Sequence, residues 1–366
     1  MGGSELDVLV VGAGVVGLTT ALCLAESGLR VGIRTAAPPG ASTSAAAGAV
    51  WGPVMAGPAQ RIREWARTSL YVLRELENVP ATGIRSLAGR ELSRVPAEPP
   101  DWIDLLDDVR LCRDDEFPPG FVSGWRYTAP VVNMPVYLEY LRARFDRAGG
   151  RIDVNPVTSL ADVTARGNAA SGSGKAGETA GVDGVGGTGD VPPVIVNCSG
   201  VAARELVPDL AVTPVRGQVV VIANPGIEEF YIDHTPAPQE VVYLFPHEST
   251  VVLGGTVNPD DRDTAPRPAL AERILRDCAT VDPRVLGARV LAHRVGLRPA
   301  RPEVRLEPEP LGGGRVLWHN YGHGGGGVTL SWGCALEIAA AVLGGTGHTG
   351  DRSAGGPLGE EEKPAG

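Results

Sequence analysis

The sequence predicts a mixed α/β fold in which a domain built on a parallel β-sheet is interleaved with a domain built on an antiparallel sheet. Two observations indicate this. Residues 7–35 alternate as buried strand, glycine turn, helix and second strand, the pattern of a βαβ unit. Residues 217–257 instead carry short strand patterns separated by turns, which is typical of antiparallel pairing. We therefore expect the segments of two domains to alternate along the chain.

The predicted domain boundaries follow this change of pattern. The parallel-sheet domain is expected at residues 1–60, 134–215 and 290–345. The antiparallel-sheet domain is expected at residues 61–133 and 216–289. Residues 165–193 lack apolar periodicity and are rich in Gly, Ala and Ser, so we expect a flexible surface insertion there. Residues 346–366 are expected to form a disordered tail.

Each element follows from a local pattern. The β-branched run at 7–14 predicts a strand buried on both faces, and residues 15–28 show helical spacing that stops at a glycine. A second strand is expected at 30–35. Further along, we expect a helix at 134–150, a strand at 151–157, a strand, turn and helix at 193–207, a helix at 268–279, strands at 293–307 and 314–320, and a helix from about Thr329.

The composition favours a small-molecule role over a nucleic-acid role. The chain of 366 residues is 43% apolar, and its net charge of −10 with a pI near 5.2 offers no basic surface for phosphate backbones. Five scattered cysteines without a CxxC pair indicate buried thiols in a reducing compartment. We find neither a leader pattern nor a window with the roughly 18 to 20 apolar residues of a membrane span, so we expect a cytoplasmic protein with no membrane partner.

The turn after the first strand carries the GxGxxG spacing of dinucleotide-binding proteins. Gly12 allows the tight turn, Gly14 lets a pyrophosphate approach the backbone, and Gly17 lets helix and strand pack closely. This spacing predicts a Rossmann-like domain but does not choose between NAD, NADP and FAD. An acidic residue usually holds the ribose at the end of the second strand, but Arg34 stands there and could equally hold the 2′-phosphate of NADP.

Candidates for substrate binding lie in the second half. The proline-stiffened RPARP motif carries Arg298, with Arg301 and Arg305 close by on the same strand. A rigid Arg could clamp a carboxylate through two parallel hydrogen bonds, or it could simply pair with neighbouring glutamates. Tyr243, on another predicted strand, is either a ligand contact or a core residue.

The stretch HNYGHGGGGVTLSWGCA, residues 319–335, places four glycines between a strand and a helix. His319 and His323 stand four residues apart but in a glycine-rich turn without a suitably spaced carboxylate, so we expect no metal site. The glycine run is better explained by a backbone that comes very close to a ligand.

These motifs, in this order, resemble those of the D-amino-acid oxidase family of flavoenzymes. The resemblance covers Asp7 to about Leu343. It rests on VVGAGVVGL, AGAVWGP, VIVNCSGV, RGQ, YLFPHESTVVLGG, GLRPARPEVRLE and HNYGHGGGGVTLSWGCA. The arginine motif and the glycine-run motif are much more specific to this family, which includes the D-aspartate oxidases, than the N-terminal glycine turn.

The resemblance implies a role for each matching residue. Arg298 would bind the substrate carboxylate, Tyr243 would assist through its hydroxyl, and the Gly325 carbonyl would accept a hydrogen bond from the substrate amine. The first domain would bind FAD non-covalently and the second would bind substrate. The implied FAD contacts are Gly12, Ala13, Gly14, Val15, Val16, Gly17, Arg34, Thr43, Ser44, Gly48, Ala49, Val50, Val157, Gly200, Gly324, Gly325, Gly326, Gly327, Val328 and Thr329.

The implied activity is oxidative deamination of D-amino acids, neutral ones favoured, to 2-oxo acids, ammonia and hydrogen peroxide. A hydride would pass from Cα to flavin N5, and O2 would reoxidise the flavin. Alternatives with the same chemistry are a D-aspartate oxidase and a glycine or sarcosine oxidase. More distant alternatives are an NADP-dependent dehydrogenase and a non-catalytic FAD-binding protein. A homodimer is left open, because the sequence does not determine the oligomeric state.

Two positions depart from the family pattern, and one residue of that pattern has no clear counterpart. Gly52 stands where many members have a larger polar side chain, and Gly326 replaces an aromatic residue. A lid tyrosine cannot be placed, and Tyr231 is a weak candidate for it. We expect these changes to affect side-chain specificity more than the chemistry.

Overall fold

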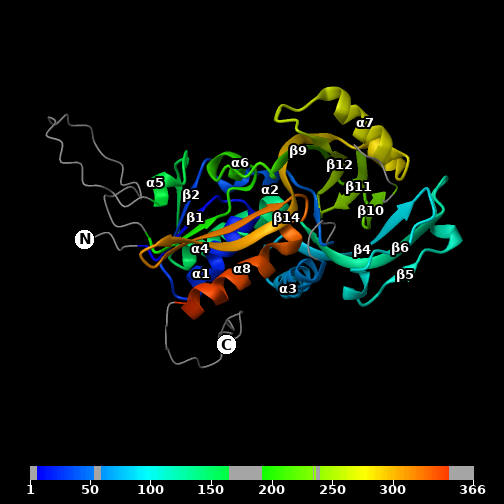
Figure 1. Cartoon of the computed structure of the whole chain (residues 1–366). Coiled ribbons are helices and arrows are strands. Elements are labelled where there is room, and N and C mark those ends of the chain that lie inside the picture. Colours follow the sequence, from blue (N-terminus) through cyan, green and yellow to red (C-terminus); the bar gives the residue numbers. More distant parts are fainter. Residues whose placement is uncertain (1–5, 53–58, 165–191, 234, 236–239, 346–366) are drawn as a thin grey trace, which may run out of the picture.

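The computed structural model describes residues 6–52, 59–164, 192–233, 235 and 240–345. Within these ranges, fifteen strands form one continuous, strongly twisted sheet, with helices packed on it (Figure 1). The mixed α/β class predicted from the sequence is confirmed. The tail at 346–366 and all but the last two residues of the insertion at 165–193 lie outside the described ranges.

One half of the sheet is parallel. Its strands run in the order β15-β8-β1-β2-β7. They are β1 (Val8–Val11), β2 (Val31–Thr35), β7 (Arg151–Val154), β8 (Val194–Asn197) and β15 (Arg315–His323). Val8 and Val10 point into the core shared with the long helices, whereas Leu9 and Val11 pack on the opposite face. The apolar run is therefore continuous because both faces of this half are covered.

The long helices gather on one face of this half. They are α1 (Val15–Glu26), α3 (Ala59–Glu77), α4 (Met134–Arg147) and α8 (Gly327–Gly345). Helix α1 lies between α4 and α8, and α3 packs on α8. The sequence did not predict α3, although its buried side chains, among them Trp65, Leu70 and Leu73, follow helical spacing.

Helix α8 is unusually apolar along almost its whole length. Its segment Gly327–Gly344 has a mean hydropathy of 1.5, which is sufficient by length and composition for a membrane span. The expectation that the chain contains no such window was therefore wrong. However, 61% of this segment is buried inside the fold, as is usual for a core helix.

The other half of the sheet is mainly antiparallel. Its strands are β3 (Ala49–Val50), β4 (Ile84–Ser93), β5 (Arg110–Leu111), β6 (Ser123–Val132), β9 (Thr213–Ala223), β10 (Phe230–Asp233), β11 (Glu240–Pro246), β12 (Thr250–Thr256), β13 (Asn258–Pro259) and β14 (Val290–Gly312). One pair, β10 with β4, is parallel, which the sequence pattern did not predict. Helix α7 (Pro268–Ala279) lies where it was predicted and covers a second core on the face formed by residues such as Val220 and Leu253.

Strand β14 joins the two halves. Its first part pairs with β9 and its second part with β15, so the sheet crosses the predicted domain boundaries without a break. Short helices occupy the connections. They are η1 (Pro39–Ala41), α2 (Thr43–Ala46), η2 (Ile103–Leu105), η3 (Asp114–Glu116), α5 (Ala161–Thr164), η4 (Gly200–Ala202), α6 (Ala203–Leu206) and η5 (Pro283–Gly287).

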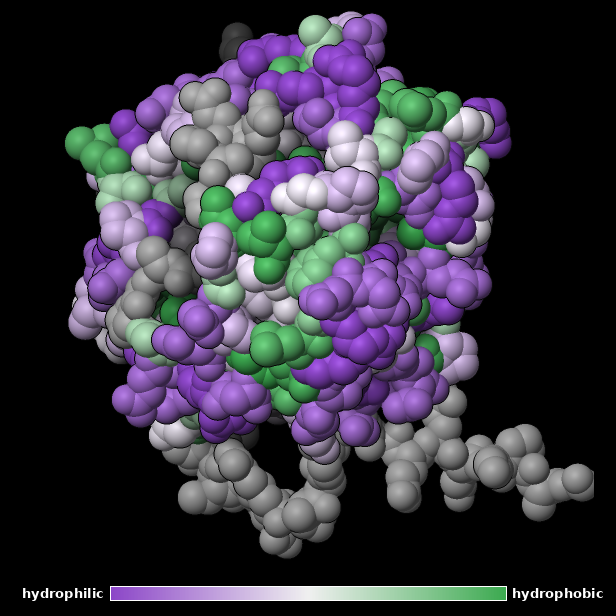
Figure 2. Space-filling model, turned by 90° about the vertical axis from the view of Figure 1, so that its right-hand side faces the viewer, coloured by the Kyte–Doolittle hydropathy of each residue, from purple (hydrophilic) through white to green (hydrophobic). Residues whose placement is uncertain are grey.

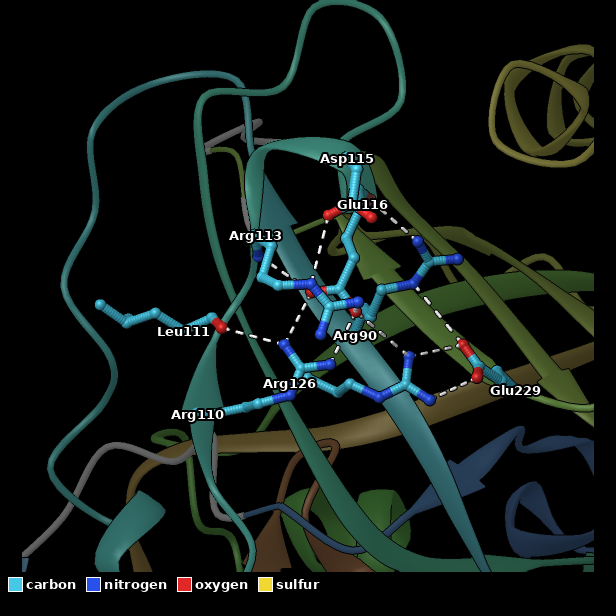
Figure 3. Close-up of polar contacts among 8 residues, drawn as sticks. All are labelled: Arg90, Arg110, Leu111, Arg113, Asp115, Glu116, Arg126 and Glu229. Carbon is cyan, nitrogen blue, oxygen red and sulfur yellow. Dashed lines mark hydrogen bonds and ion pairs between the residues drawn. The ribbon is translucent and has the colours of Figure 1, made fainter.

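The antiparallel end carries a network of charged side chains (Figure 3). Arg110 donates two hydrogen bonds of 2.6 and 2.7 Å to the carboxylate of Glu116, and Arg126 makes a paired contact with Glu229. Arg90 donates to the Glu116 carbonyl at 2.9 Å and lies 3.7 Å from Glu229. The network ties β4, β5, β6 and η3 to the start of β10. Figure 2 shows this end of the molecule as largely hydrophilic, with small separate hydrophobic patches.

Candidate active site

A cavity of about 350 Å³ opens at the carboxyl ends of the parallel strands. Residues following β1, β2 and β8 line it on one side, and the middle of β14 and the end of β15 line it on the other. Helix α2, which lies against β14, contributes Thr43, Ser44 and Ala46. In open α/β sheets, ligands bind at this edge, where neighbouring strands diverge.

The glycine turn after β1 has the geometry that its spacing predicts. Gly12 has a φ of +107°, and a Cβ atom there would lie 2.5 Å from the carbonyl oxygen of Cys198. A Cβ atom at Gly17 would lie 2.0 Å from the Gly12 carbonyl oxygen, so Gly17 serves close packing and does not line the cavity. The Ser44 hydroxyl accepts a hydrogen bond of 3.0 Å from the Val15 amide at the start of α1. Bare backbone and the positive end of α1 thus border the cavity.

Arg34 closes the cavity at the end of β2. Its Nε atom is buried and has no hydrogen-bond partner among the described residues. The neighbouring Thr35 hydroxyl donates to the Ala37 carbonyl at 2.9 Å. A buried, unsatisfied donor at the position that usually meets the adenosine ribose fits a bound dinucleotide, as does the glycine cradle.

Most of the predicted cofactor contacts line this cavity. They are Gly12, Ala13, Gly14, Val15, Val16, Arg34, Thr43, Ser44, Gly48, Val157, Gly200, Gly324, Gly325, Gly327 and Val328. Five do not: Gly17, Ala49, Val50, Gly326 and Thr329. Ala49 and Val50 pair with β6, and Thr329 uses its hydroxyl to donate to the Gly52 carbonyl at 3.3 Å. The side chains or backbone of these residues serve the fold around the cavity.

Arg298 and Tyr243 meet on the cavity wall. The Arg298 guanidinium donates a hydrogen bond of 2.9 Å to the Thr256 carbonyl, and its charge lies beside the Tyr243 side chain. Burial raises the pKa of Tyr243, whereas the Arg298 charge acts in the opposite direction. The hydroxyl therefore stays protonated at neutral pH.

Two glycines make room for this pair. A Cβ atom at Gly217 would lie 2.4 to 2.5 Å from the Arg298 guanidinium, and one at Gly254 would lie 1.8 Å from the Tyr243 ring. Both side chains consequently lie flat on bare backbone of β9 and β12. These glycines were not predicted, since only strand pairing brings them under the two side chains.

The three arginines of the RPARP region have different partners. Arg301 donates to Asp209 at 3.0 Å, and Arg305 donates to Glu307 at 2.7 Å. For Arg298, by contrast, no carboxylate lies within 4.0 Å among the residues that the structure describes. Arg298 is therefore the arginine with an unused capacity to bind an anion.

The glycine run forms the turn between β15 and α8. Gly325 is exposed, lines the cavity, and has open space where a Cβ atom would be. Gly326 is buried, does not line the cavity, and donates its amide to the His323 carbonyl at 2.8 Å. Helix α8 begins at Gly327, two residues earlier than predicted, with its N-terminus at the cavity.

The histidines of this stretch have separate environments. His323 lines the cavity, and its burial lowers the pKa to about 4, so its imidazole is neutral. His319 forms a 3.0 Å contact with Glu309. Within the described ranges, no group of three or more His, Cys, Asp or Glu residues is placed to hold a metal ion.

Several cavity residues were missed by the sequence reasoning. They include Ser42, Cys198, Ser199, Gly217, Asn320, Tyr321 and His323. Cys198 and Ser199 could have been found from their position directly after a buried parallel strand. Tyr231, the weak candidate for a lid, instead lies in the second core, where its ring packs edge-on against Phe121.

A glycine turn at a helix N-terminus, a cavity at the strand ends and an arginine without a carboxylate partner among the described residues fit a dinucleotide-dependent oxidoreductase of small acids. The comparisons with known proteins agree. Residues 7–341 match the family of FAD-dependent oxidoreductases, DAO. This chain belongs to that family, and the prediction of FAD as its cofactor is confirmed.

The most similar relatives span nearly the whole chain. A D-amino-acid oxidase of Rubrobacter xylanophilus is 46% identical over 334 residues, covering 91% of this chain and 94% of the relative. A D-amino-acid oxidase of Streptomyces coelicolor is 42% identical, covering 91% and 95%. The solved structure of a glycine oxidase from Bacillus cereus has a TM-score of 0.70 at 20% identity, covering 93% of this chain and 95% of that one, which shows the shared fold.

Proposed function

We propose that this chain is a D-amino-acid oxidase that prefers neutral substrates. The observation that carries the proposal is Arg298, a cation on the cavity wall with no carboxylate partner among the described residues and with the protonated Tyr243 hydroxyl beside it. Bound FAD supplies the redox chemistry by accepting two electrons from the substrate and passing them to O2. The relatives in Rubrobacter xylanophilus and Streptomyces coelicolor, both D-amino-acid oxidases, support the same activity.

The residues of the chain act by positioning. Arg298 binds the substrate carboxylate, and Tyr243 donates a hydrogen bond to it. The carbonyl of Gly325 accepts a hydrogen bond from the amine at the opposite side of the cavity. Fixing both groups orients the Cα–H bond and distinguishes the two enantiomers, because only one arrangement leaves the side chain in free space.

No carboxylate or lysine of the described chain lines the cavity. His323 is neutral at physiological pH and Tyr243 keeps its proton, so neither gains a charge on substrate binding. The substrate amine must therefore lose its proton before or during binding, and the expected activity rises with pH as the neutral amine becomes more abundant.

The charged side chains that line the cavity also support the preference for neutral substrates. Arg34 and Arg298 are the cationic side chains among the described cavity residues, and Arg34 stands at the far end, beside the glycine turn. A second carboxylate, as in D-aspartate, would have to be desolvated without a counter-ion. A D-aspartate oxidase is the alternative that this observation disfavours.

The test uses the yellow holoenzyme under nitrogen. We expect D-alanine and D-methionine to bleach the flavin absorption and, in air, to release hydrogen peroxide, while L-alanine does neither. D-aspartate and glycine should react much more slowly. Faster peroxide release with D-aspartate would refute the neutral preference, and absence of bleaching with every D-amino acid would refute the oxidase assignment.

A further inference from the structure

A cluster of polar side chains outside the cavity holds the part of the cavity wall formed by Tyr321 and residues 199–202. Tyr321 lines the cavity and is 1% exposed, with its hydroxyl directed away from the ligand space toward Asp209. The hydroxyl donates to Asp209 Oδ2 at 2.8 Å and accepts from Arg305 at 2.7 Å. Arg301 donates to the same Asp209 oxygen at 3.0 Å. We call Asp209, Arg301, Arg305 and Tyr321 the Asp209 cluster.

Asp209 also organises its own loop. Its other oxygen accepts from the Ala211 amide at 3.0 Å, and its carbonyl accepts from the Val212 amide at 3.1 Å. Burial acts to raise the pKa of Asp209, but hydrogen bonds from Tyr321, Ala211 and Arg301 outweigh it and lower the pKa. The carboxylate is therefore ionised whenever the protein is folded at neutral pH.

The loop leads directly into cavity-lining backbone. Residues 199–202 and Leu206 line the cavity, and Ala203 and Val212 pack on the ring of Tyr321 in a small buried core. One carboxylate thus connects the loop after α6, strand β14 and strand β15.

We propose that Asp209 is a positioning residue that holds this wall in the shape that retains FAD. The inference rests on FAD occupying the cavity, as family membership implies, but not on the identity of the substrate. Asp209 touches neither the cavity nor the proposed substrate contacts, so its effect should appear in cofactor retention and not in substrate affinity.

The experiment measures the rate at which the full-length holoenzyme releases FAD on dilution, followed by the rise in free flavin fluorescence. For Asp209→Asn we expect release to be about tenfold faster, since a charge-assisted hydrogen bond is worth roughly one such factor or more. Tyr321→Phe keeps the ring on the wall but removes the hydroxyl, and we expect a similar change. Because both act through one cluster, the double variant should release FAD little faster than either single variant.

Glu307→Gln is the matched control. It removes a carboxylate that binds Arg305 at 2.7 Å but lies outside the contacts of Asp209, and FAD release should stay within about twofold of wild type. The apparent KM for D-alanine should also be unchanged in Asp209→Asn, which separates this role from general damage. If Asp209→Asn does not fold, Tyr321→Phe decides the question.

Wild-type FAD release in the variants would overturn the proposal, even if their thermal stability falls. If Glu307→Gln accelerated FAD release equally, the proposal would also be overturned, because the loss of any nearby carboxylate would then produce the effect. FAD release can be measured even if no D-amino acid reacts. The proposal for Asp209 and the proposed oxidase activity can therefore be refuted independently of each other.

Discussion

Arginine side chains have different roles at the antiparallel end of this sheet and at the cavity beside its middle strand β14. At the antiparallel end, Arg110 and Arg126 are each bound to a glutamate through both terminal nitrogens (Figure 3). At the cavity, Arg298 donates to the Thr256 carbonyl and has no carboxylate within 4.0 Å in the part of the chain that the structure describes. Both kinds lie on strands and are partly buried. The number of acidic partners, not burial or charge, distinguishes an arginine that holds the fold from one that takes a ligand.

The largest effect should follow from Arg298→Ala. Losing a charge-assisted pair of hydrogen bonds should weaken substrate binding about 100-fold or more, whereas FAD remains bound. Anaerobic titration of flavin bleaching with D-alanine gives the apparent affinity. Arg126→Ala is the matched control and should leave that affinity unchanged. Equal losses of substrate affinity in both variants would contradict the different roles of Arg298 and Arg126.

A smaller loss is expected for Tyr243→Phe. Removing one hydroxyl that donates to the carboxylate should raise the KM for D-alanine about tenfold. Tyr231→Phe provides the comparison, because the Tyr231 hydroxyl is buried outside the cavity and has no hydrogen-bond partner among the described residues. Steady-state peroxide assays should show a normal KM for that control. An unchanged KM in Tyr243→Phe would show that the Tyr243 hydroxyl does not bind the substrate carboxylate.

Gly217→Ala tests whether the backbone beneath Arg298 sets its position. A Cβ atom there would press on the guanidinium, which can shift, so we expect KM to rise about fivefold with little change in kcat. Gly287→Ala is matched, since no atom lies within 4 Å of its added Cβ. A wild-type KM in Gly217→Ala would show that the backbone at Gly217 does not set the position of Arg298.

The smallest effect on activity should come from Glu116→Gln at the antiparallel end. Hydrogen bonds from Arg110, then from the Arg113 amide, hold the pKa of Glu116 well below its usual value. A depressed folded-state pKa adds stability above the unfolded pKa of about 4.3, and that stability is lost as pH falls further. The variant should therefore have a lower Tm at pH 7, and the difference should shrink below about pH 4.

Thermal melts of wild type and Glu116→Gln between about pH 7 and pH 4 test whether the difference in Tm shrinks as the pH falls. The KM for D-alanine should be the same in both proteins. A Tm difference that grows toward acid pH would contradict the assignment of the network as an ionised one.

Local pattern was sufficient for much of the fold. The buried run at Val8–Val11, the turn at Gly12 and the helix α7 all lie where their spacing predicts. Helix α3 was not predicted, although its buried side chains follow helical spacing. The parallel pairing of β4 with β10 could not be predicted, because it joins strands more than a hundred residues apart. Pairing over such distances depends on how the whole sheet is assembled and leaves no periodic signal.

Some features of the candidate site also follow from local sequence, whereas others depend on the folded chain. Glycine spacing predicts the cradle at Gly12, since a positive φ and close approach exclude side chains there. Resemblance pointed to Arg298, but spacing alone treats it like Arg301 and Arg305. Arg305 pairs with Glu307 two residues along the same strand, whereas only the folded chain brings Asp209 to Arg301. Within the described ranges, Arg298 is left without a carboxylate.

The sequence by itself determined the mixed α/β class, the glycine turn and the family, because each depends on residues close together along the chain. The tertiary structure decided which arginine faces the cavity, which glycines lie beneath it, and which carboxylate supports the wall at Tyr321. Those outcomes depend on where distant segments meet. Whether a charge is satisfied or free is a property of its neighbours in space, and the chain acquires those neighbours only when it folds.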